Sequence, residues 1–120
     1  MSAMPPIIYH ITSQSEWERA RAAGAYTAPS LAQEGFIHAS TREQVIRTAN
    51  LYFQGAAGLV LLCIDAARLT AELRYDPVPG TGQQFPHIYG PLNLDAVIAV
   101  IAFPAHPLTG QFELPDSLPS

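Results

Sequence analysis

The feature that most constrains the fold of this chain is an unbroken apolar run, GLVLLCID, at residues 58–65. The run has the length of a strand and does not alternate between apolar and polar residues. This pattern is typical of a β-strand buried on both faces. Such a strand needs neighbours at its edges and cover on both faces. We therefore expect it to be the central strand of a sheet.

Four other segments have the length and the β-branched or apolar residues of short strands. They lie at residues 7–11, 36–39, 71–75 and 97–103. Between the last two, the stretch DPVPGTGQQ at residues 76–84 is rich in proline and glycine, which predicts a loop. Asn93 is expected to cap a short turn before the final strand.

Two helices are expected in the first half of the chain, each opened by a serine and a glutamate at capping-box spacing. The two pairs are Ser13 with Glu16 and Ser40 with Glu43. Gly24 and Gly55 mark the expected ends of the two helices. The stretch YTAPSLAQEG between them is expected to be a loop or a single helical turn. Two helices followed by several strands predict an α+β fold.

Length and composition are those of one globular domain. The chain has 120 residues, of which 48% are hydrophobic and 13% are charged, so a sizeable core can be buried. We expect a single domain over residues 1–120, with its core at about 7–103. The proline-rich tail at 104–120 is expected to be loosely attached.

The charge balance limits which partners the chain can bind. The net charge is −4, and all six basic residues are arginines. An acidic chain with few cations is a poor match for a large nucleic acid, which needs many phosphate contacts. One small phosphorylated ligand held by one or two arginines stays compatible with it. Arg42 and Arg74 lie closest to the motifs below, although a solvated surface position is the ordinary expectation for both.

The single cysteine, Cys63, excludes an internal disulfide and fits a reducing compartment. Its apolar neighbours favour a buried thiol over a nucleophile. The N-terminus shows no secretory signal pattern, and no apolar run approaches the roughly 20 residues that span a bilayer. We expect a cytoplasmic protein with no membrane partner; its oligomeric state is left open.

Three of the four histidines lie in short motifs of similar character: IIYHITS, EGFIHAST and FPHIYGP. These motifs place His10, His38 and His87 among apolar neighbours. Histidine exchanges protons near neutral pH, so three together suit acid–base chemistry. The alternative is that each is a half-buried histidine with a backbone partner. His106 lies in the tail and is expected at the surface.

Two other chemistries also use histidines. Zinc can bind three histidines, but the chain has neither His-x-His nor HExxH spacing, so no metal is expected. HIT at residues 10–12 and HAS at residues 38–40 have the His-x-Ser/Thr form of the two-histidine phosphoesterases. Those enzymes use one histidine as base and the other as acid on a cyclic phosphate. Their motifs lie further apart in two lobes, so the fit is poor.

Taken together, IYHIT, GFIHAST, LYF, LVLLCID, LRYD and FPHIYGPL resemble the bacterial domain-of-unknown-function family 952. The resemblance runs from about Ile7 to Phe103, and the order and spacing of the histidine motifs make it specific. It implies a fold similar to that of the ADP-ribosyltransferases, whose split β-sheets bind NAD in a cleft between them.

The resemblance also implies roles for individual residues. His10 matches a first-strand position that holds ribose or adenylate, and His38 matches the position that faces nicotinamide. Ser40 and Thr41 stand where hydroxyls follow in several relatives. Tyr52 lies on the helix that matches the one behind the cleft.

The third motif departs from the ADP-ribosyltransferase pattern. It usually supplies a glutamate that activates the acceptor, whereas FPHIYG offers His87 with Tyr89 nearby and has no acid. Protein modification is therefore doubtful. The RNA 2′-phosphotransferases share the fold and lack that glutamate, but they are basic, and this acidic chain is a poor match for a large RNA.

Three hypotheses follow. The first is an enzyme that binds NAD or a related nucleotide and acts at the nicotinamide–ribose bond on a small substrate. Its expected catalytic residues are His10, His38 and His87. The residues expected to bind the cofactor are His10, Ser40, Thr41, Tyr89 and Arg42. The second is a non-catalytic nucleotide-binding module with the same cleft. The third is the phosphoesterase, and in each case the loop at 76–84 is a candidate lid.

Overall fold

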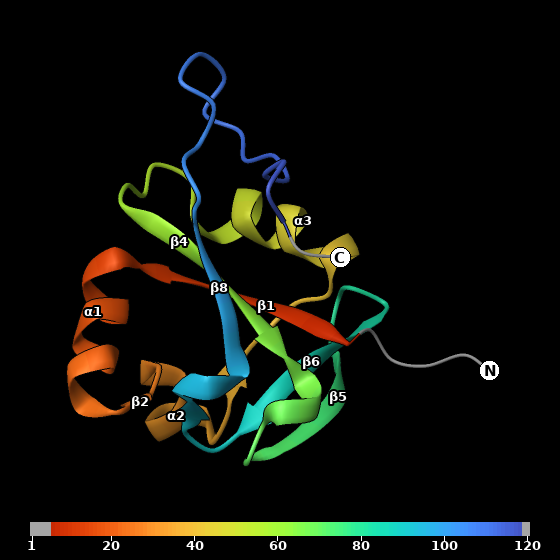
Figure 1. Cartoon of the computed structure of the whole chain (residues 1–120). Coiled ribbons are helices and arrows are strands. Elements are labelled where there is room, and N and C mark those ends of the chain that lie inside the picture. Colours follow the sequence, from red (N-terminus) through yellow and green to blue (C-terminus); the bar gives the residue numbers. More distant parts are fainter. Residues whose placement is uncertain (1–5, 119–120) are drawn as a thin grey trace.

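The apolar run forms the central strand of a three-stranded sheet, as its sequence predicted. The computed structural model describes residues 6–118. In it, β4 (Leu59–Asp65) lies between β1 (Ile7–Ser13) and β8 (Val97–Ala102) and pairs antiparallel with both (Figure 1). Burial is nearly complete along β4 and raises the pKa of the Cys63 thiol to about 11. Cys63 is therefore a core thiol, as expected.

Two smaller antiparallel sheets complete the β structure. One has the order β3-β6-β5, with β3 at Ile37–His38, β5 at Glu72–Val78 and β6 at Gln83–Tyr89. The other joins β2 (Ala25–Tyr26) to β7 (Leu92–Asn93), two strands that the sequence did not predict. The expected α+β class is confirmed.

The stretch at 76–84 is not the loop that its prolines and glycines predicted. Strands β5 and β6 continue into it and pair up to Val78 and Gln83, which leaves only residues 79–82 as the turn of a hairpin. The positive φ angles of Gly80 and Gly82 supply the turn. Pairing outweighs the local composition because Pro77 lies on β5, at the edge of its sheet.

Three α-helices surround the sheets. Helix α1 (Gln14–Ala23) begins at the predicted Ser13 cap and ends at Gly24, and α2 (Pro29–Glu34) forms where a loop or single turn was expected. Helix α3 (Arg42–Tyr52) begins one residue later than predicted. Its capping box is Thr41 with Gln44, so the prediction that Ser40 and Glu43 form this box is wrong.

Short 3₁₀ turns follow two of the strands. One is Ala66–Arg68, capped by the Asp65 side chain as expected, and the other is Leu94–Ala96. Asn93 precedes the second turn but makes no side-chain cap. Its oxygen instead accepts from the Thr70 N–H, and its amide donates to the Arg68 carbonyl. None of the helices within residues 6–118 is long and apolar enough to cross a membrane.

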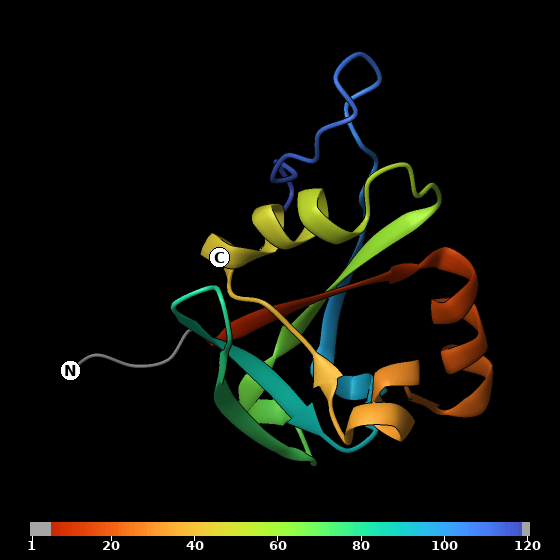
Figure 2. The same ribbon diagram turned by 180° about the vertical axis from the view of Figure 1, so that it is seen from behind.

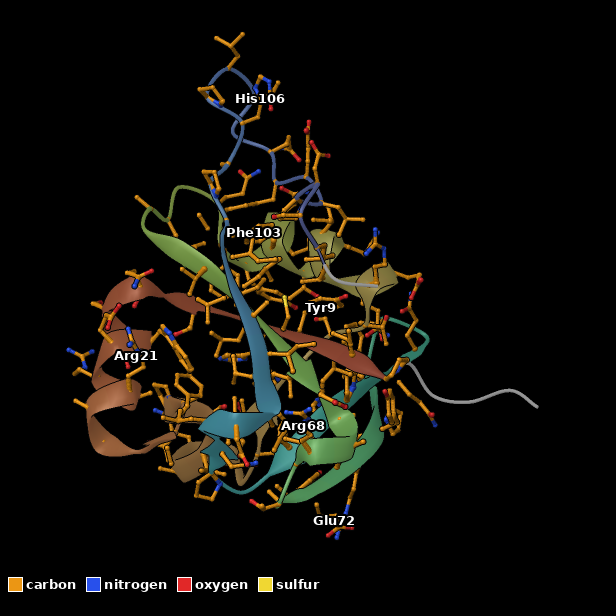
Figure 3. All side chains as sticks on the ribbon, viewed as in Figure 1. Tyr9, Arg21, Arg68, Glu72, Phe103 and His106 are labelled. Atoms are coloured by element: carbon orange, nitrogen blue, oxygen red, sulfur yellow. The ribbon has the colours of Figure 1, made fainter. Side chains whose placement is uncertain are left out.

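Apolar side chains cover both faces of the β1-β4-β8 sheet. On one face Ile8, Leu62 and Ile64 pack with Trp17 of α1 and with Ile88 of β6. The other face packs against α3 and the C-terminal tail. Its buried members are Tyr9, Ile11, Val45, Ala49, Leu59, Leu61, Cys63, Phe103 and Phe112. Figure 3 shows Tyr9 and Phe103 between the sheet and α3.

The tail is anchored more firmly than expected. Phe112 is 2% exposed and stacks on Phe103 with ring centroids 5.0 Å apart. Asn50 of α3 accepts a hydrogen bond from the Phe112 N–H and donates to its carbonyl. The core therefore extends beyond the predicted boundary at residue 103.

Candidate functional site

The β3-β6-β5 sheet has one apolar and one polar face. Because successive side chains of a strand point to opposite faces, Ile37 and its partner Ile88 face the core while His38 and its partner His87 share the other face. The pairing of β3 with β6 therefore brings together two of the three predicted histidines.

Aromatic contacts hold these two imidazoles. The rings of His38 and His87 meet edge to face, with centroids 5.3 Å apart. Phe36 stacks on the His87 ring at 4.0 Å and contacts the edge of His38 at 4.9 Å. One side of the His87 ring is thus covered by protein, which fixes the ring plane.

A carboxylate that the sequence analysis missed lies beside His87. Asp76 of β5 is on the same sheet face, and its Oδ2 accepts a hydrogen bond from His87 Nδ1 at 2.8 Å. The same oxygen accepts from the Tyr89 hydroxyl. The Tyr89 and His87 hydrogen bonds lower the pKa of Asp76, and the bond to Asp76 raises the pKa of Tyr89. FPHIYG itself contains no acid, but the adjacent strand supplies one.

The second nitrogen of His87 has no hydrogen-bond partner among the described residues. Nε2 is buried, although a nitrogen in this position ordinarily costs about 1–3 kcal/mol if it stays unpaired. With Nδ1 donating to Asp76, Nε2 of the neutral ring is an acceptor. Because the two ring nitrogens point in nearly opposite directions, Nε2 is turned away from β5.

His38 has a carboxylate partner of its own. Its Nε2 lies 3.0 Å from Oε2 of Glu34, the last residue of α2. The side chains of His38 and Glu34 are 54% and 48% exposed, so this pair is open to solvent, whereas the His87–Asp76 pair is largely covered. The two histidines therefore differ in environment although they touch.

His10 is a buried and fully hydrogen-bonded side chain. Its Nδ1–H donates to the His38 carbonyl, which can only accept. Nε2 is then the acceptor for the Tyr26 hydroxyl at 2.7 Å, and Tyr26 lies 3.1 Å from the Thr12 hydroxyl. Burial lowers the pKa of His10 to about 4, so the ring is neutral at physiological pH. This matches the reading of a satisfied histidine with a backbone partner.

The same region joins two of the sheets. Tyr9 and Ser40 exchange backbone hydrogen bonds of 2.8 Å in both directions, which attaches the segment after β3 to the edge of β1. Together with the bond from His10 to the His38 carbonyl, this bridge fixes where the second histidine motif crosses the first.

A cleft of about 1070 Å³ opens beside this junction, and all three histidines line it. It is bordered by α3, the start of α2 and the β5–β6 hairpin, and Figure 2 shows how these elements are arranged. Gln44 of α3 donates to the Gln84 carbonyl and the Gln83 side chain, so helix and hairpin are tied together. The hairpin therefore borders the cleft where a lid was predicted.

Of the other predicted site residues, one lines the cleft and three do not. Ser40 lines the cleft, and Arg47, which the sequence analysis did not single out, lines it from α3. Three predicted residues are not part of the lining. Thr41 is the N-cap of α3. Arg42 lies near the Tyr9 hydroxyl, whose pKa it lowers against the larger effect of burial. Tyr89 is bound to Asp76.

The arginines differ in what they already bind. Arg74 pairs with Glu72 through two nitrogens and lies over the Tyr89 ring at 4.6 Å. Its guanidinium is therefore already bound within the protein and is not available to hold a phosphate. Within residues 6–118, Arg47 forms none of the ion pairs of the structure. Over the same residues, no three His, Cys, Asp or Glu side chains are grouped to hold a metal.

Comparison with known proteins agrees with the histidine motifs. The chain matches the family described as protein of unknown function (DUF952) over residues 11–100. It is similar to the crystal structure of protein CC0527 from Caulobacter crescentus, with 38% identity, a TM-score of 0.79, and 89% of this chain and 93% of that chain covered. The solution NMR structure of CC0527 matches with 36% identity and a TM-score of 0.74, covering 86% of this chain and 89% of that one. No curated protein matches. The predicted family is confirmed, and this chain belongs to DUF952.

Proposed function

We propose that this protein is an enzyme that binds NAD, or a nucleotide closely related to it, in the histidine cleft and acts at the nicotinamide–ribose bond. The observation that carries the proposal is the convergence of His10, His38 and His87 on one cleft. Three motifs far apart in the sequence meet there, and the family resemblance assigns those motifs to an NAD site.

The cleft has the size and the chemistry that such a ligand requires. Its volume of about 1070 Å³ lies just above the usual range of ligand pockets, which is about 300–1,000 Å³. Tyr52 and Phe85 offer aromatic surfaces to the flat ends of a nucleotide, and Arg47 offers a guanidinium to its phosphates. Arg47 forms no ion pair within residues 6–118, so its cation can meet a small phosphorylated ligand in the cleft.

The three histidines have different roles in this proposal. His38 is exposed in the cleft and contacts the ligand near nicotinamide. His87 is the proton acceptor. His10 is a positioning residue, because both of its ring nitrogens are occupied and its hydrogen bond to the His38 carbonyl holds the second motif in place. The same occupancy weighs against the two-histidine phosphoesterase hypothesis, which needs His10 as an acid or a base.

The first test is a ligand-observed NMR titration with NAD, ADP-ribose, nicotinamide and a 2′,3′-cyclic nucleotide. We expect NAD to bind and His38→Ala to weaken it about tenfold, equivalent to about 1.4 kcal/mol. His106→Ala is the matched control, since His106 lies in the tail away from the cleft (Figure 3). Binding of the cyclic nucleotide alone would contradict the proposal in favour of a phosphoesterase.

Turnover separates the enzyme from a binding module with the same cleft. Free nicotinamide should appear slowly in the NMR spectrum of the wild-type mixture with NAD, and more slowly with His38→Ala. Tight NAD binding without any nicotinamide release over days would support the non-catalytic module instead.

A further inference from the structure

The second nitrogen of His87 is the polar atom of the site whose partner is still to be assigned. Nδ1 is occupied by Asp76, one ring face is covered by Phe36, and His87 borders the cleft. Nε2 is buried and unpartnered among the described residues. A hydrogen-bond donor from a ligand in the cleft is the partner that would satisfy it.

Resting on the proposed function, we infer that His87, positioned by Asp76, is the general base of the cleft and that its acceptor substrate is water or another neutral hydroxyl. A neutral imidazole with a free Nε2 takes a proton from an O–H group. A phosphate acceptor is already an anion and needs no such base. The Asp76–His87 pair thereby takes the role of the glutamate that FPHIYG lacks.

The step balances as a hydrolysis. The bond between ribose C1′ and the nicotinamide ring nitrogen breaks, and its electron pair leaves with nicotinamide. The oxygen of water forms a new bond to C1′, and its proton passes to His87 Nε2. The products are ADP-ribose, nicotinamide and one proton, with no oxidant or reductant. With an alcohol in place of water, the product is the O-glycoside of ADP-ribose with that alcohol.

The surroundings of His87 fit a base whose protonated form must be stabilised. The charged and titratable groups that face it are Asp76 and Arg74 from β5, Tyr89 from β6 and His38 from β3. Arg74 is neutralised by Glu72, so the Asp76 carboxylate is the group that compensates the imidazolium as it forms. Asp76 acts through His87 and is a positioning residue.

The test compares Asp76→Asn and His87→Gln with Asp116→Asn, the same carboxylate-to-amide change at an exposed residue of the tail. Asp116 is not part of the cleft lining. We expect kcat for nicotinamide release to fall on the order of 100-fold in Asp76→Asn and His87→Gln, and less than about twofold in Asp116→Asn. Equal losses in all three, or none, would overturn the inference.

Two further readouts separate a base from a merely structural residue. In the wild type, ¹⁵N shifts should show His87 with a protonated Nδ1 and a free Nε2, and Asp76→Asn should change this tautomer, since an amide can donate to the ring. The wild-type rate should fall as the pH drops, and in Asp76→Asn the fall should begin at a lower pH. An unchanged tautomer and pH profile would overturn the role of Asp76.

Methanol tests the acceptor class. Added to wild-type protein and NAD, it should divert part of the ADP-ribose into its methyl glycoside. Inorganic phosphate as the preferred acceptor would overturn the inference while leaving the proposed function intact. A wild-type protein that releases no nicotinamide would instead refute the proposed function itself, whatever the His87 tautomer.

Discussion

Phe112→Ala is expected to lower the free energy of unfolding by about 3–4 kcal/mol, the usual cost of removing a fully buried phenylalanine. Phe112 is 2% exposed and stacks on Phe103, although it belongs to a proline-rich tail without helix or strand. Its loss removes both the aromatic pair and the cover over Phe103. Urea denaturation at neutral pH measures the change, and the Tm should fall by more than about 10 °C.

Leu108→Ala is the matched control for this prediction, because Leu108 lies in the same tail and is 90% exposed. It should change stability by less than about 0.5 kcal/mol. Asn50→Ala should give an intermediate loss, since Asn50 makes two hydrogen bonds to the Phe112 backbone. A Phe112→Ala protein as stable as Leu108→Ala would show that the tail is not part of the folded unit.

The contacts that anchor the tail could not be predicted from the sequence. Prolines correctly predicted irregular backbone, but irregular backbone can still be anchored by long-range contacts. The partners of Phe112 are Phe103 on β8 and Asn50 on α3, and no local pattern reports a contact with a residue 62 positions away. The central strand was predictable because a run of consecutive apolar residues indicates that it is buried.

The start of α3 was ambiguous for a physical reason. Ser40 precedes Glu43, and Thr41 precedes Gln44, so two overlapping capping boxes are available. The structure uses the second, because the Ser40 backbone is already paired with Tyr9. Choosing between them requires the bridge to β1, which is a tertiary contact.

The candidate site likewise contains residues that the sequence predicted and residues that only the tertiary structure reveals. The three histidines were recognisable from their motifs. Asp76 was not, since it opens a stretch whose prolines and glycines predicted a loop, and its contact with His87 depends on the register of β5 against β6. The cleft-lining arginine likewise depends on the rotation of α3, which presents Arg47 and not Arg42.

Acidification from about pH 6.5 to pH 4 is expected to destabilise the fold by about 3 kcal/mol through His10 alone. Burial lowers the pKa of His10 from 6.5 to about 4 in the folded protein. The unfolded chain therefore binds a proton first as the pH falls. Stability is complete above about pH 6.5 and declines until the folded ring is also protonated near pH 4. Urea denaturation at several pH values in this interval measures the slope.

His10→Gln isolates this contribution from that of the other histidines. Glutamine keeps a donor and an acceptor near the His38 carbonyl and Tyr26 but does not titrate. We expect the variant to be less stable than the wild type at pH 7, by about 1–2 kcal/mol. Its stability should vary less with pH, so the two proteins should approach or cross near pH 4. His106→Gln is the control and should keep the wild-type slope, because its side chain lies in the tail outside the core.

The pH interval distinguishes His10 from the carboxylates. The pKa of Asp76 is lowered below its usual 3.8 by Tyr89 and His87, so its stabilising effect is present above about pH 4 and is lost only as the pH falls further. A loss of stability confined to pH values below 4, with parallel curves for wild type and His10→Gln, would contradict a neutral buried His10. It would also remove the reason for treating His10 as a positioning residue, since a protonated ring cannot accept the Tyr26 hydrogen bond.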